Sequence, residues 1–202
     1  EFFKGSQKQG FDFYSAHLFI RDAGRVKALA LGDFQAGFGQ GLTMWSGVNF
    51  GKGVDVIGIA KNQEGLRPYT AVDENNFFRG GGVTLAFGKH TELTAFYSNK
   101  KRDAGIIGKE NGTLIISSLQ QSGLHRTPRE IECKIAVREK VRGIYLRFSS
   151  GGLNLGVTAF QMLLDAEYRR RLSFYNQFDF SSNIYRGAGI DFRYLRANIN
   201  LF

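Results

Sequence analysis

Serine and histidine are the residue types in this chain that could carry out nucleophilic catalysis. A membrane-embedded hydrolase would place Ser98 or Ser117, as nucleophile, beside His17 or His90, as general base, on neighbouring strands. The sequence spacing selects no such pair, and the histidines show neither HExxH nor zinc-finger spacing. We therefore predict no catalytic residue, no metal site and no cofactor, and a Ser/His hydrolase is the weakest of three functional hypotheses.

A polar turn is predicted around Pro128. His125, Arg126, Thr127 and Glu130 place several hydrogen-bond donors and a carboxylate around this proline. Catalysis by His125 is one interpretation of the group. We favour a structural turn held by hydrogen bonds of Thr127 and Glu130, because such side chains commonly stabilise turns.

Two glycine-rich stretches invite comparison with phosphate-binding loops. They are GFGQGL at residues 37 to 42 and GKGVDVIG at residues 51 to 58. Both lack the third glycine of the GxGxxG fingerprint, and no Lys-Ser or Lys-Thr pair completes a Walker loop. Gly39 and Gly41 therefore indicate close backbone packing or a bend rather than nucleotide binding.

An acidic and aromatic stretch, DENNFFRG, occupies residues 73 to 80 just before a predicted strand. Pairing of Asp73 or Glu74 with Arg79 would pin the preceding long loop to the sheet. A general acid/base role would need a partner motif that the sequence lacks.

Basic residues outnumber acidic ones, 27 to 18, and the net charge of +9 suggests an acidic partner. Clusters at residues 100 to 102 and 169 to 171, the second near Tyr168 and Phe174, could bind phosphates and stack bases. A soluble basic β-domain that binds single-stranded nucleic acid is thus the second hypothesis. The same charges suit anionic lipid head groups, so nucleic acid is not the partner that we favour.

The composition favours strands as the elements that position these residues. Aromatic content is 14%, with 26 glycines and only 2 prolines, which is typical of pleated strands joined by glycine turns. No stretch has the roughly 20 uninterrupted apolar residues of a membrane-spanning helix. The lone Cys133 excludes an internal disulfide and a CxxC motif. We predict a single domain over residues 1 to 202.

The clearest alternation of apolar and polar side chains lies at residues 130 to 139 and 143 to 148. A short connection around Lys140 would join the two runs as a hairpin, and a turn at residues 149 to 152 would lead into a third strand. These strands predict an up-and-down meander. The apolar positions that we expect to face lipid are Ile131, Ile135, Val137, Ile144, Leu146, Phe148, Leu153 and Leu155.

Further strands are predicted on both sides of this meander. Hairpins are expected with turns at residues 21 to 24 and 88 to 90, a strand at residues 113 to 119, and a bulge near Tyr194. We count roughly ten strands, with tight turns on one side and longer loops on the other. The expected long loops are residues 61 to 79, 99 to 112 and 162 to 171.

Alternation alone does not distinguish a membrane barrel from a soluble sandwich. A sandwich buries the apolar faces and exposes the charged ones to water. A barrel turns the apolar faces to lipid and holds charges in a lumen where they must be paired or hydrated.

Four stretches resemble the barrel portion of outer-membrane proteins of Bacteroidetes-type bacteria, a family often described through a helix-hairpin-helix region before the barrel. They are GDFQAGFGQGL from residue 32, GLRPYTAVDENNFFRG from residue 65, FYSNKKRDA from residue 96 and SGLHRTPREIE from residue 122. The similarity covers most of residues 10 to 160. No reaction is assigned in that family to the positions that match. These positions are Asp33, Gly39, Gly41, Glu74, Arg79, Gly80, Asp103, His125, Arg126, Thr127 and Glu130.

The resemblance implies an all-β, antiparallel meander that forms a transmembrane β-barrel or a large portion of one. It further implies a non-enzymatic structural, transport or assembly role in the bacterial outer membrane, in contact with outer-membrane lipid and with other envelope proteins as candidate partners. The chain shows no helix-hairpin-helix segment, so DNA contact is not implied. We expect it to be truncated at one or both ends, because it begins at Glu1 without a signal sequence.

Overall fold

The computed structural model describes residues 14–46, 63–71, 75–110, 112–119, 133–169, 174 and 181–202. Within these ranges all regular secondary structure is β-strand, and neighbouring strands of the main sheet are antiparallel. The predicted all-β antiparallel meander is therefore confirmed.

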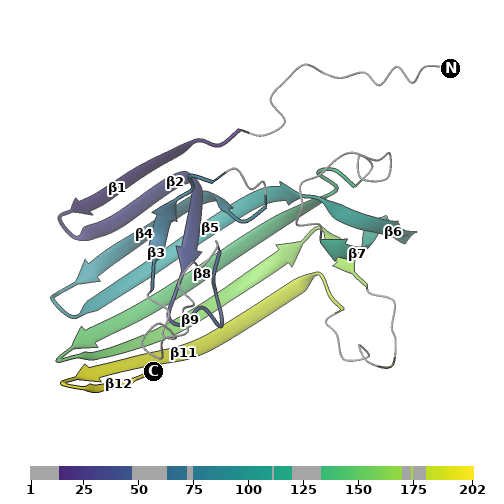
Figure 1. Cartoon of the computed structure of the whole chain (residues 1–202). Helices are drawn as coiled ribbons and strands as arrows, with labels where there is room; N and C mark the ends of the chain where they lie inside the picture. The colour runs from purple at the N-terminus through teal and green to yellow at the C-terminus, as the bar shows by residue number, and fades with distance from the viewer. Residues whose placement is uncertain are drawn as a thin grey trace.

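Most strands belong to one curved sheet (Figure 1). They follow the order β1-β2-β4-β5-β8-β9-β11-β12, and β3 pairs with the end of β2. In the described ranges β1 and β12 form two separate edges, so the sheet is open. The bounds are His17–Ala23 for β1, Val26–Gly37 for β2, Gly65–Pro68 for β3, Phe78–Phe87 for β4, Thr91–Arg102 for β5, Val137–Ser150 for β8, Leu153–Leu164 for β9, Ile184–Arg196 for β11 and Ile199–Leu201 for β12.

A small second sheet lies at one end of the main sheet (Figure 1). It contains β6 (Ala104–Glu110), β7 (Thr113–Leu119) and β10 (Ala166–Tyr168), with β7 in the middle. Ile116 of β7 packs with Val137 and Leu164, which attaches this sheet to the ends of β8 and β9.

The segments predicted as long loops contain strands. β3 and the start of β4 fall within residues 61 to 79, β5 and β6 cover most of residues 99 to 112, and β10 lies within residues 162 to 171. The predicted strand at residues 113 to 119 is confirmed as β7. Polar composition misled the prediction because these strands carry many charged and polar side chains.

Tight turns connect neighbouring strands at one end of the main sheet, on the left in Figure 1. They join β1 to β2, β4 to β5, β8 to β9 and β11 to β12. In the β8–β9 turn, Gly151 and Gly152 have φ angles of 55° and 86°, which residues with a Cβ rarely adopt. The longer connections lie at the other end, so the predicted separation of tight turns from long connections is confirmed.

The predicted hairpin around Lys140 is wrong. β8 runs without interruption from Val137 to Ser150 and contains Lys140. A turn precedes it, in which Ile135 has a φ angle of 54°, and residues 130 to 132 lie outside the described residues. The error arose because the exposed side chains of β8 change from basic to apolar at Ile144, and this change resembles a break between two strands.

The predicted bulge near Tyr194 is also wrong. β11 continues to Arg196, and a turn at Ala197 and Asn198 leads back into β12. The chain reverses here, with Arg196 paired to Ile199 and Leu195 to Asn200. The hairpins β1–β2 and β4–β5 are confirmed.

Glycine and phenylalanine alternate across the inner, concave face of the main sheet. Cross-strand pairing aligns Gly82, Phe96, Gly143, Phe160 and Gly187 in one row over five strands. A Cβ at Gly143 would overlap the Phe96 ring, and one at Gly187 would overlap the Phe160 ring. Each ring thus lies over the backbone of a neighbouring glycine, which allows the sheet to curve around a compact core.

The segment of residues 37 to 46 packs against the inner face. The ring of Phe38 stacks on Tyr145 of β8, with 4.7 Å between the ring centroids, and Thr43 lies against Gly189 of β11. At Gly39, whose φ angle is 55°, a Cβ would overlap the side chain of Asp191. The geometry at Gly39 agrees with the interpretation of close backbone packing.

The Gly143→Ala substitution tests the alternating row. It forces a methyl group into the space of the buried Phe96 ring, and we expect a loss of about 1–3 kcal/mol in the free energy of unfolding. Gly108→Ala, in β6 and with open space around its Cβ position, is the matched control and should change stability by less than about 1 kcal/mol. Denaturant titration of both variants measures the difference, and equal effects would contradict the role of the row.

Candidate functional site

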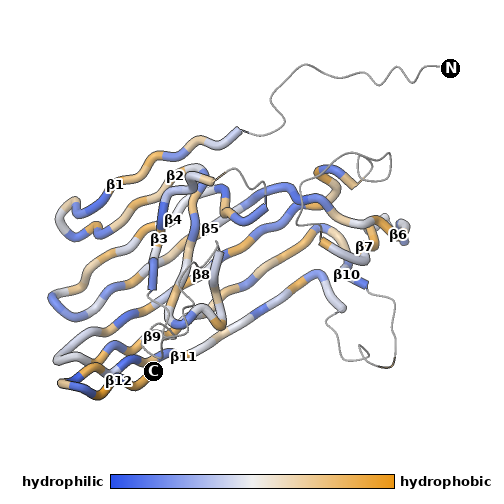
Figure 2. The backbone as a smooth tube through the Cα atoms, in the orientation of Figure 1, coloured by the Kyte–Doolittle hydropathy of each residue, from blue (hydrophilic) through white to orange (hydrophobic). Residues whose placement is uncertain are grey.

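The outer, convex face of the main sheet is apolar in three consecutive rows. Hydrophobic and hydrophilic residues alternate along the strands (Figure 2), and successive side chains of a strand point to opposite faces of the sheet. The pairing registers align each row across β4, β5, β8, β9 and β11. The rows are Phe87, Thr91, Phe148, Leu155 and Phe192; Leu85, Leu93, Leu146, Val157 and Ile190; and Val83, Ala95, Ile144, Ala159 and Ala188.

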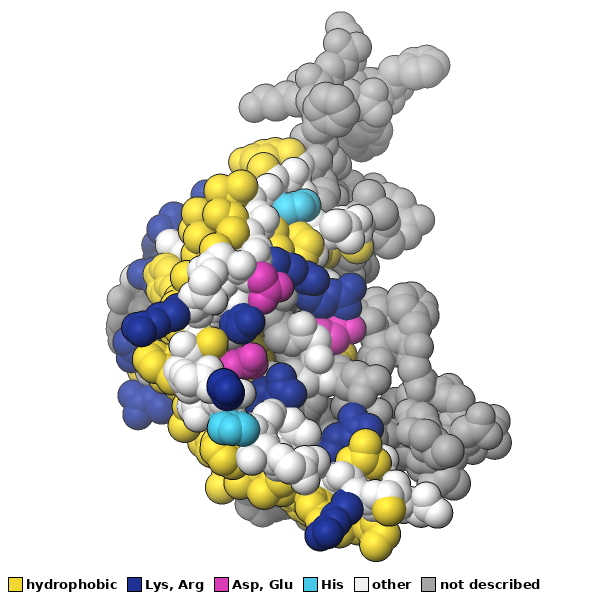
Figure 3. Space-filling model, turned by 90° about the vertical axis from the view of Figure 1, so that its left-hand side faces the viewer, with side chains coloured by type: hydrophobic (Ala, Val, Ile, Leu, Met, Phe, Trp, Pro, Cys, Tyr) yellow, Lys and Arg dark blue, Asp and Glu magenta, His cyan; other side chains and the backbone are white. Residues whose placement is uncertain are grey.

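Most of the side chains in these rows are exposed, and the others are half-buried. Leu146 is 45% exposed, Phe87 54% and Ile190 83%. The face continues onto β2 and β1, where Leu18 and Leu31 are paired and exposed. Seen from the tight-turn end, hydrophobic side chains gather along the outer rim of the curve and the visible acidic ones lie inside it (Figure 3). We call this surface the apolar outer face.

Four of the positions predicted to face lipid, Ile144, Leu146, Phe148 and Leu155, are exposed on this surface. Leu153 shares their face and is partly buried. The prediction for Val137 is wrong, because its side chain is 1% exposed and packs at the second sheet. Ile135 is exposed but lies in the turn before β8, and Ile131 lies outside the described residues.

Val137 differs from Ile144 because the two positions are an odd number of residues apart in one uninterrupted strand. Along β8 the residues from Val137 to Tyr145 in steps of two are buried or half-buried, and the residues between them are exposed. Arg138, one residue after Val137, therefore lies on the outer side of the sheet.

The inner face holds charges in pairs. Arg102 donates from Nη1 to Oε2 of Glu139 at 2.8 Å, and both side chains are largely buried. Lys100, 6% exposed, donates from Nζ to the backbone carbonyls of Asn75 and Phe77 at 2.5 and 2.6 Å. A cavity of about 270 Å³ lies beside these side chains. Sequence reasoning missed this cluster, because it read residues 100 to 102 as one exposed basic patch.

A second inner group lies nearer the tight turns. Arg147 is 3.5 Å from Glu92 and donates to Oδ1 of Asn154 at 3.1 Å. The hydroxyl of Tyr145 donates to Oε1 of Gln63 at 2.9 Å and lies 3.5 Å from Oδ1 of Asp191. Charges of both signs on neighbouring strands thus form complementary pairs.

Asp33 and Arg79 form the best-defined ion pair of the site. The guanidinium donates from Nε and Nη2 to the two carboxylate oxygens at 2.7 and 2.9 Å, and Asp33 is 2% exposed. Asp33 also accepts from the backbone N–H of Ala16, and Arg79 donates to the carbonyl of Tyr14. The pair therefore ties β2, β4 and the segment before β1 together.

Arg79 thus has a different partner from the one that the sequence suggested. The prediction paired it with Asp73 or Glu74, which lie outside the described residues. The register of β2 and β4 instead places Asp33 opposite Arg79. Among the other predicted structural positions, Gly80 lies directly against the Tyr97 carbonyl, and Asp103 accepts from the N–H of Ile135 at 2.7 Å. His125, Arg126, Thr127 and Glu130 lie outside the described residues.

The second predicted basic cluster is only partly described. Arg169 donates to Glu167 at 2.9 Å and to Glu110 at 2.8 Å. These hydrogen bonds, the one from Glu167 first, raise the pKa of the Arg169 guanidinium. Arg170 and Arg171 lie outside the described residues. Arg169 is therefore engaged by two carboxylates rather than presented to a phosphate.

Three of the four residues considered for catalysis, Ser98, Ser117 and His90, contact backbone groups. Ser98 is fully buried and accepts from the N–H of Arg79 at 3.0 Å. Ser117 donates to the carbonyl of Gly105, and Nδ1 of His90 lies 2.8 Å from the carbonyl of Ser149. In the described ranges, no cluster of three His, Cys, Asp or Glu side chains could hold a metal ion.

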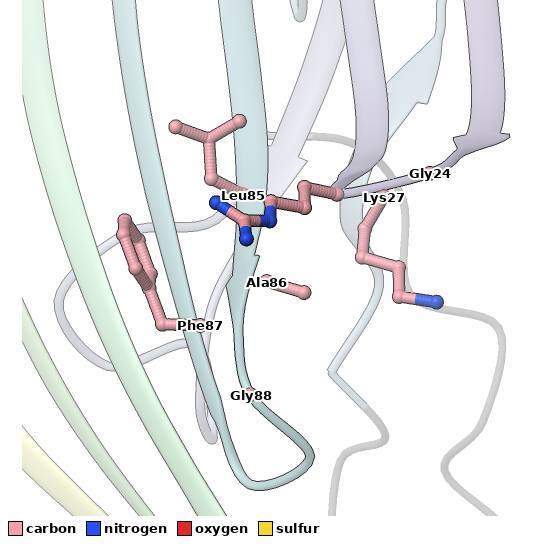
Figure 4. A pocket seen from close by; sticks show the side chains of 7 residues that line it. Gly24, Lys27, Leu85, Ala86, Phe87 and Gly88 are labelled. Atoms are coloured by element: carbon pink, nitrogen blue, oxygen red, sulfur yellow. The ribbon is translucent and has the colours of Figure 1, made fainter.

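An open hollow of about 720 Å³ lies between the β1–β2 and β4–β5 turns (Figure 4). Leu85, Phe87 and the backbone at Gly24 and Gly88 line it, and Lys27 points away from its centre in this view. Arg25 and Lys27 are the ionisable side chains of its described lining. The hollow thus continues the apolar outer face toward the turns.

The Asp33→Ala substitution should destabilise the fold markedly. It removes a buried carboxylate and leaves the Arg79 guanidinium and the Ala16 N–H without that acceptor. Because Arg79 is partly solvated, we expect a loss of roughly 2–3 kcal/mol in the free energy of unfolding. Lys27→Gln, which breaks the exposed pair with Asp22 at 3.2 Å, should cost no more than about 1 kcal/mol. Equal costs in denaturant titration would show that the Asp33 pair has no special role.

Helices are absent from the described part of the chain, so none of sufficient length and hydrophobicity to cross a membrane is found there. No family model, no curated protein and no solved structure matches the chain. Inferences on function therefore depend on the apolar outer face and on the inner clusters.

Proposed function

We propose that this chain forms part of the wall of an outer-membrane β-barrel, with its apolar outer face against lipid and a non-enzymatic structural, transport or assembly role. The observation that carries the proposal is the continuity of the three apolar rows across five strands, extended onto β2 and β1. A surface of this kind costs about 25 cal/mol for each Å² that it exposes to water. Lipid removes that cost.

Packing on the other face of the sheet argues against a soluble sandwich. A sandwich core would use the apolar outer face, and the second face would be solvated. Here the inner face is occupied by the aromatic core around Phe34, Phe96 and Tyr145 and by paired charges. The apolar outer face carries no second layer in the described residues, because the small sheet packs at the end of β8 and β9.

The first apolar row has the composition of a membrane interface. It places Phe87, Phe148 and Phe192 in one line beside the tight turns. Outer-membrane barrels carry aromatic girdles where the apolar band meets head groups. The β8, β9 and β11 strands contain 14, 12 and 13 residues, more than the roughly 9–11 that such a strand needs to cross.

The arrangement of connections supports the same proposal. Bacterial barrels have short turns on the periplasmic side and longer loops on the outside. By this rule the four tight turns would lie on the periplasmic side, and the second sheet would lie at the outer surface.

Substitution of Leu146 by Arg tests the proposal. Leu146 is in the middle apolar row, and an arginine at the centre of a bilayer should cost roughly 2–4 kcal/mol of folding free energy in phosphatidylcholine vesicles. The matched control Ser150→Arg, exposed on the same strand beside the turn, should cost about 0–1 kcal/mol. Stability is read from denaturant titration of the vesicle-inserted protein.

The opposing result is equally clear. A monodisperse, water-soluble monomer in which both arginine variants are as stable as the parent would contradict the proposal, since exposed surface positions in water tolerate charge.

A further inference from the structure

We infer that a basic belt at the long-connection end of the outer face binds the phosphate groups of anionic membrane lipids. The belt consists of Lys101, Arg138, Lys140, Arg142 and Arg186. This inference rests on the proposed function, because it assumes that the neighbouring apolar rows contact the same leaflet. To the proposed function it adds the chemical class of the lipid that the outer face contacts.

The belt follows directly from the strand registers. Beyond Ile144, the outer side of β8 continues with Arg142, Lys140 and Arg138, and all three are exposed. Lys101 of β5 is paired with Arg138, and the row of Arg142 continues through Gln161 to Arg186. The row of Arg142, Gln161 and Arg186 therefore borders the third apolar row on β8, β9 and β11.

On the outer face the cross-strand neighbours of Lys140 and Arg142 are not carboxylates, whereas Arg138 has Asp165 beside it. Lys140 is paired with Asn99 and Leu163, and Arg142 with Tyr97 and Gln161. Arg142 donates from Nε to Oε1 of Gln161 at 2.9 Å, a neutral acceptor. In the described ranges no ion pair is found for the side chains of the belt.

The acidic side chains of these strands already have hydrogen-bond partners. Glu139 and Glu92, on the same strands, pair with Arg102 and Arg147 on the inner face. Asp165, at the end of β9, uses Oδ1 to accept the backbone N–H of Arg138 at 2.7 Å. Like charges that face each other across a strand pair, such as Lys101 and Arg138, are destabilising unless an anion lies between them.

A hollow of about 290 Å³ lies where the belt meets the apolar rows. Arg142 and Gln161 line its polar side, and Ile144 and Ala159 its apolar side, with Gly143 between them. Small residues leave this space open on the outer surface. A lipid fits this hollow if its phosphate lies beside Arg142 on the polar side and its acyl chain lies over Ile144 on the apolar side. A free inorganic anion would occupy only the polar side.

Long basic side chains suit this position. Their stems can lie along apolar surface while the charged ends reach the head groups. Each Lys or Arg near an anionic membrane surface adds about 1 kcal/mol of attraction, which is roughly fivefold in affinity. Three such charges on one strand therefore give a preference for anionic lipid that can be measured.

The test compares the full chain with the triple variant Arg138→Gln, Lys140→Gln, Arg142→Gln. Vesicles consist of phosphatidylcholine alone or of equal parts of phosphatidylcholine and phosphatidylglycerol, and binding is measured by flotation at low and high salt. We expect the parent protein to prefer the anionic vesicles, and the variant to lose that preference by roughly tenfold or more. Binding to phosphatidylcholine alone should be unchanged.

A matched triple variant, Arg25→Gln, Lys89→Gln, Arg196→Gln, removes the same charge from three exposed positions at the tight-turn end. This control variant should keep most of the preference for anionic vesicles. An equal loss in both variants, or no loss in the belt variant, overturns the inference. If the triple belt variant does not insert, Lys140→Gln alone should still reduce the preference by roughly fivefold, and an unchanged preference there also overturns it.

The two proposals fail in different ways. Failure of the parent protein to bind phosphatidylcholine vesicles would contradict the proposed membrane location. Binding to those vesicles without any preference for the anionic ones would leave the location intact and contradict the basic belt alone.

Discussion

The inner row in which glycine and phenylalanine alternate is the packing constraint on which both faces of the main sheet depend. Phe96 and Phe160 occupy the space that a Cβ at Gly143 or Gly187 would need, so the strands fit only in the observed register. A slip of one residue in β9 would turn Phe160 outward and bring Val157 into the core. The apolar outer face therefore exists as continuous rows because the inner face fixes the register.

The two faces treat charge differently, and this difference follows from the packing. Inside, Glu139 is 4% exposed at its side chain and lies 2.8 Å from Arg102, as expected where an unpaired charge would be costly. Outside, Arg138 and Lys140 remain exposed and need no partner in water or among head groups. Exposed positive charge thus lies on the outer side at the long-connection end of the sheet, beside the apolar rows.

Local features of the fold could be predicted from the sequence. Period-two alternation and glycine turns located the hairpins at residues 21 to 24, 88 to 90 and 149 to 152, because a hairpin depends on neighbours in the chain. The bond between Asp33 and Arg79 joins residues 46 positions apart, and only the register of β2 with β4 selects it. The sequence offered the nearer Asp73 and Glu74, and no local signal opposed that choice.

The error in β8 shows why a strand that changes environment is difficult to predict. Val137, Glu139 and Val141 are buried on one side, while the other side is basic for its first part and apolar for the rest. Such a strand has no single hydrophobic face. The buried residues fix the position of the first part of β8. Val137 packs with Ile116 and Leu164, and Glu139 is paired with Arg102. Arg138 and Lys140 are therefore displayed on a rigid backbone, and their spacing is set by the core rather than by a loop.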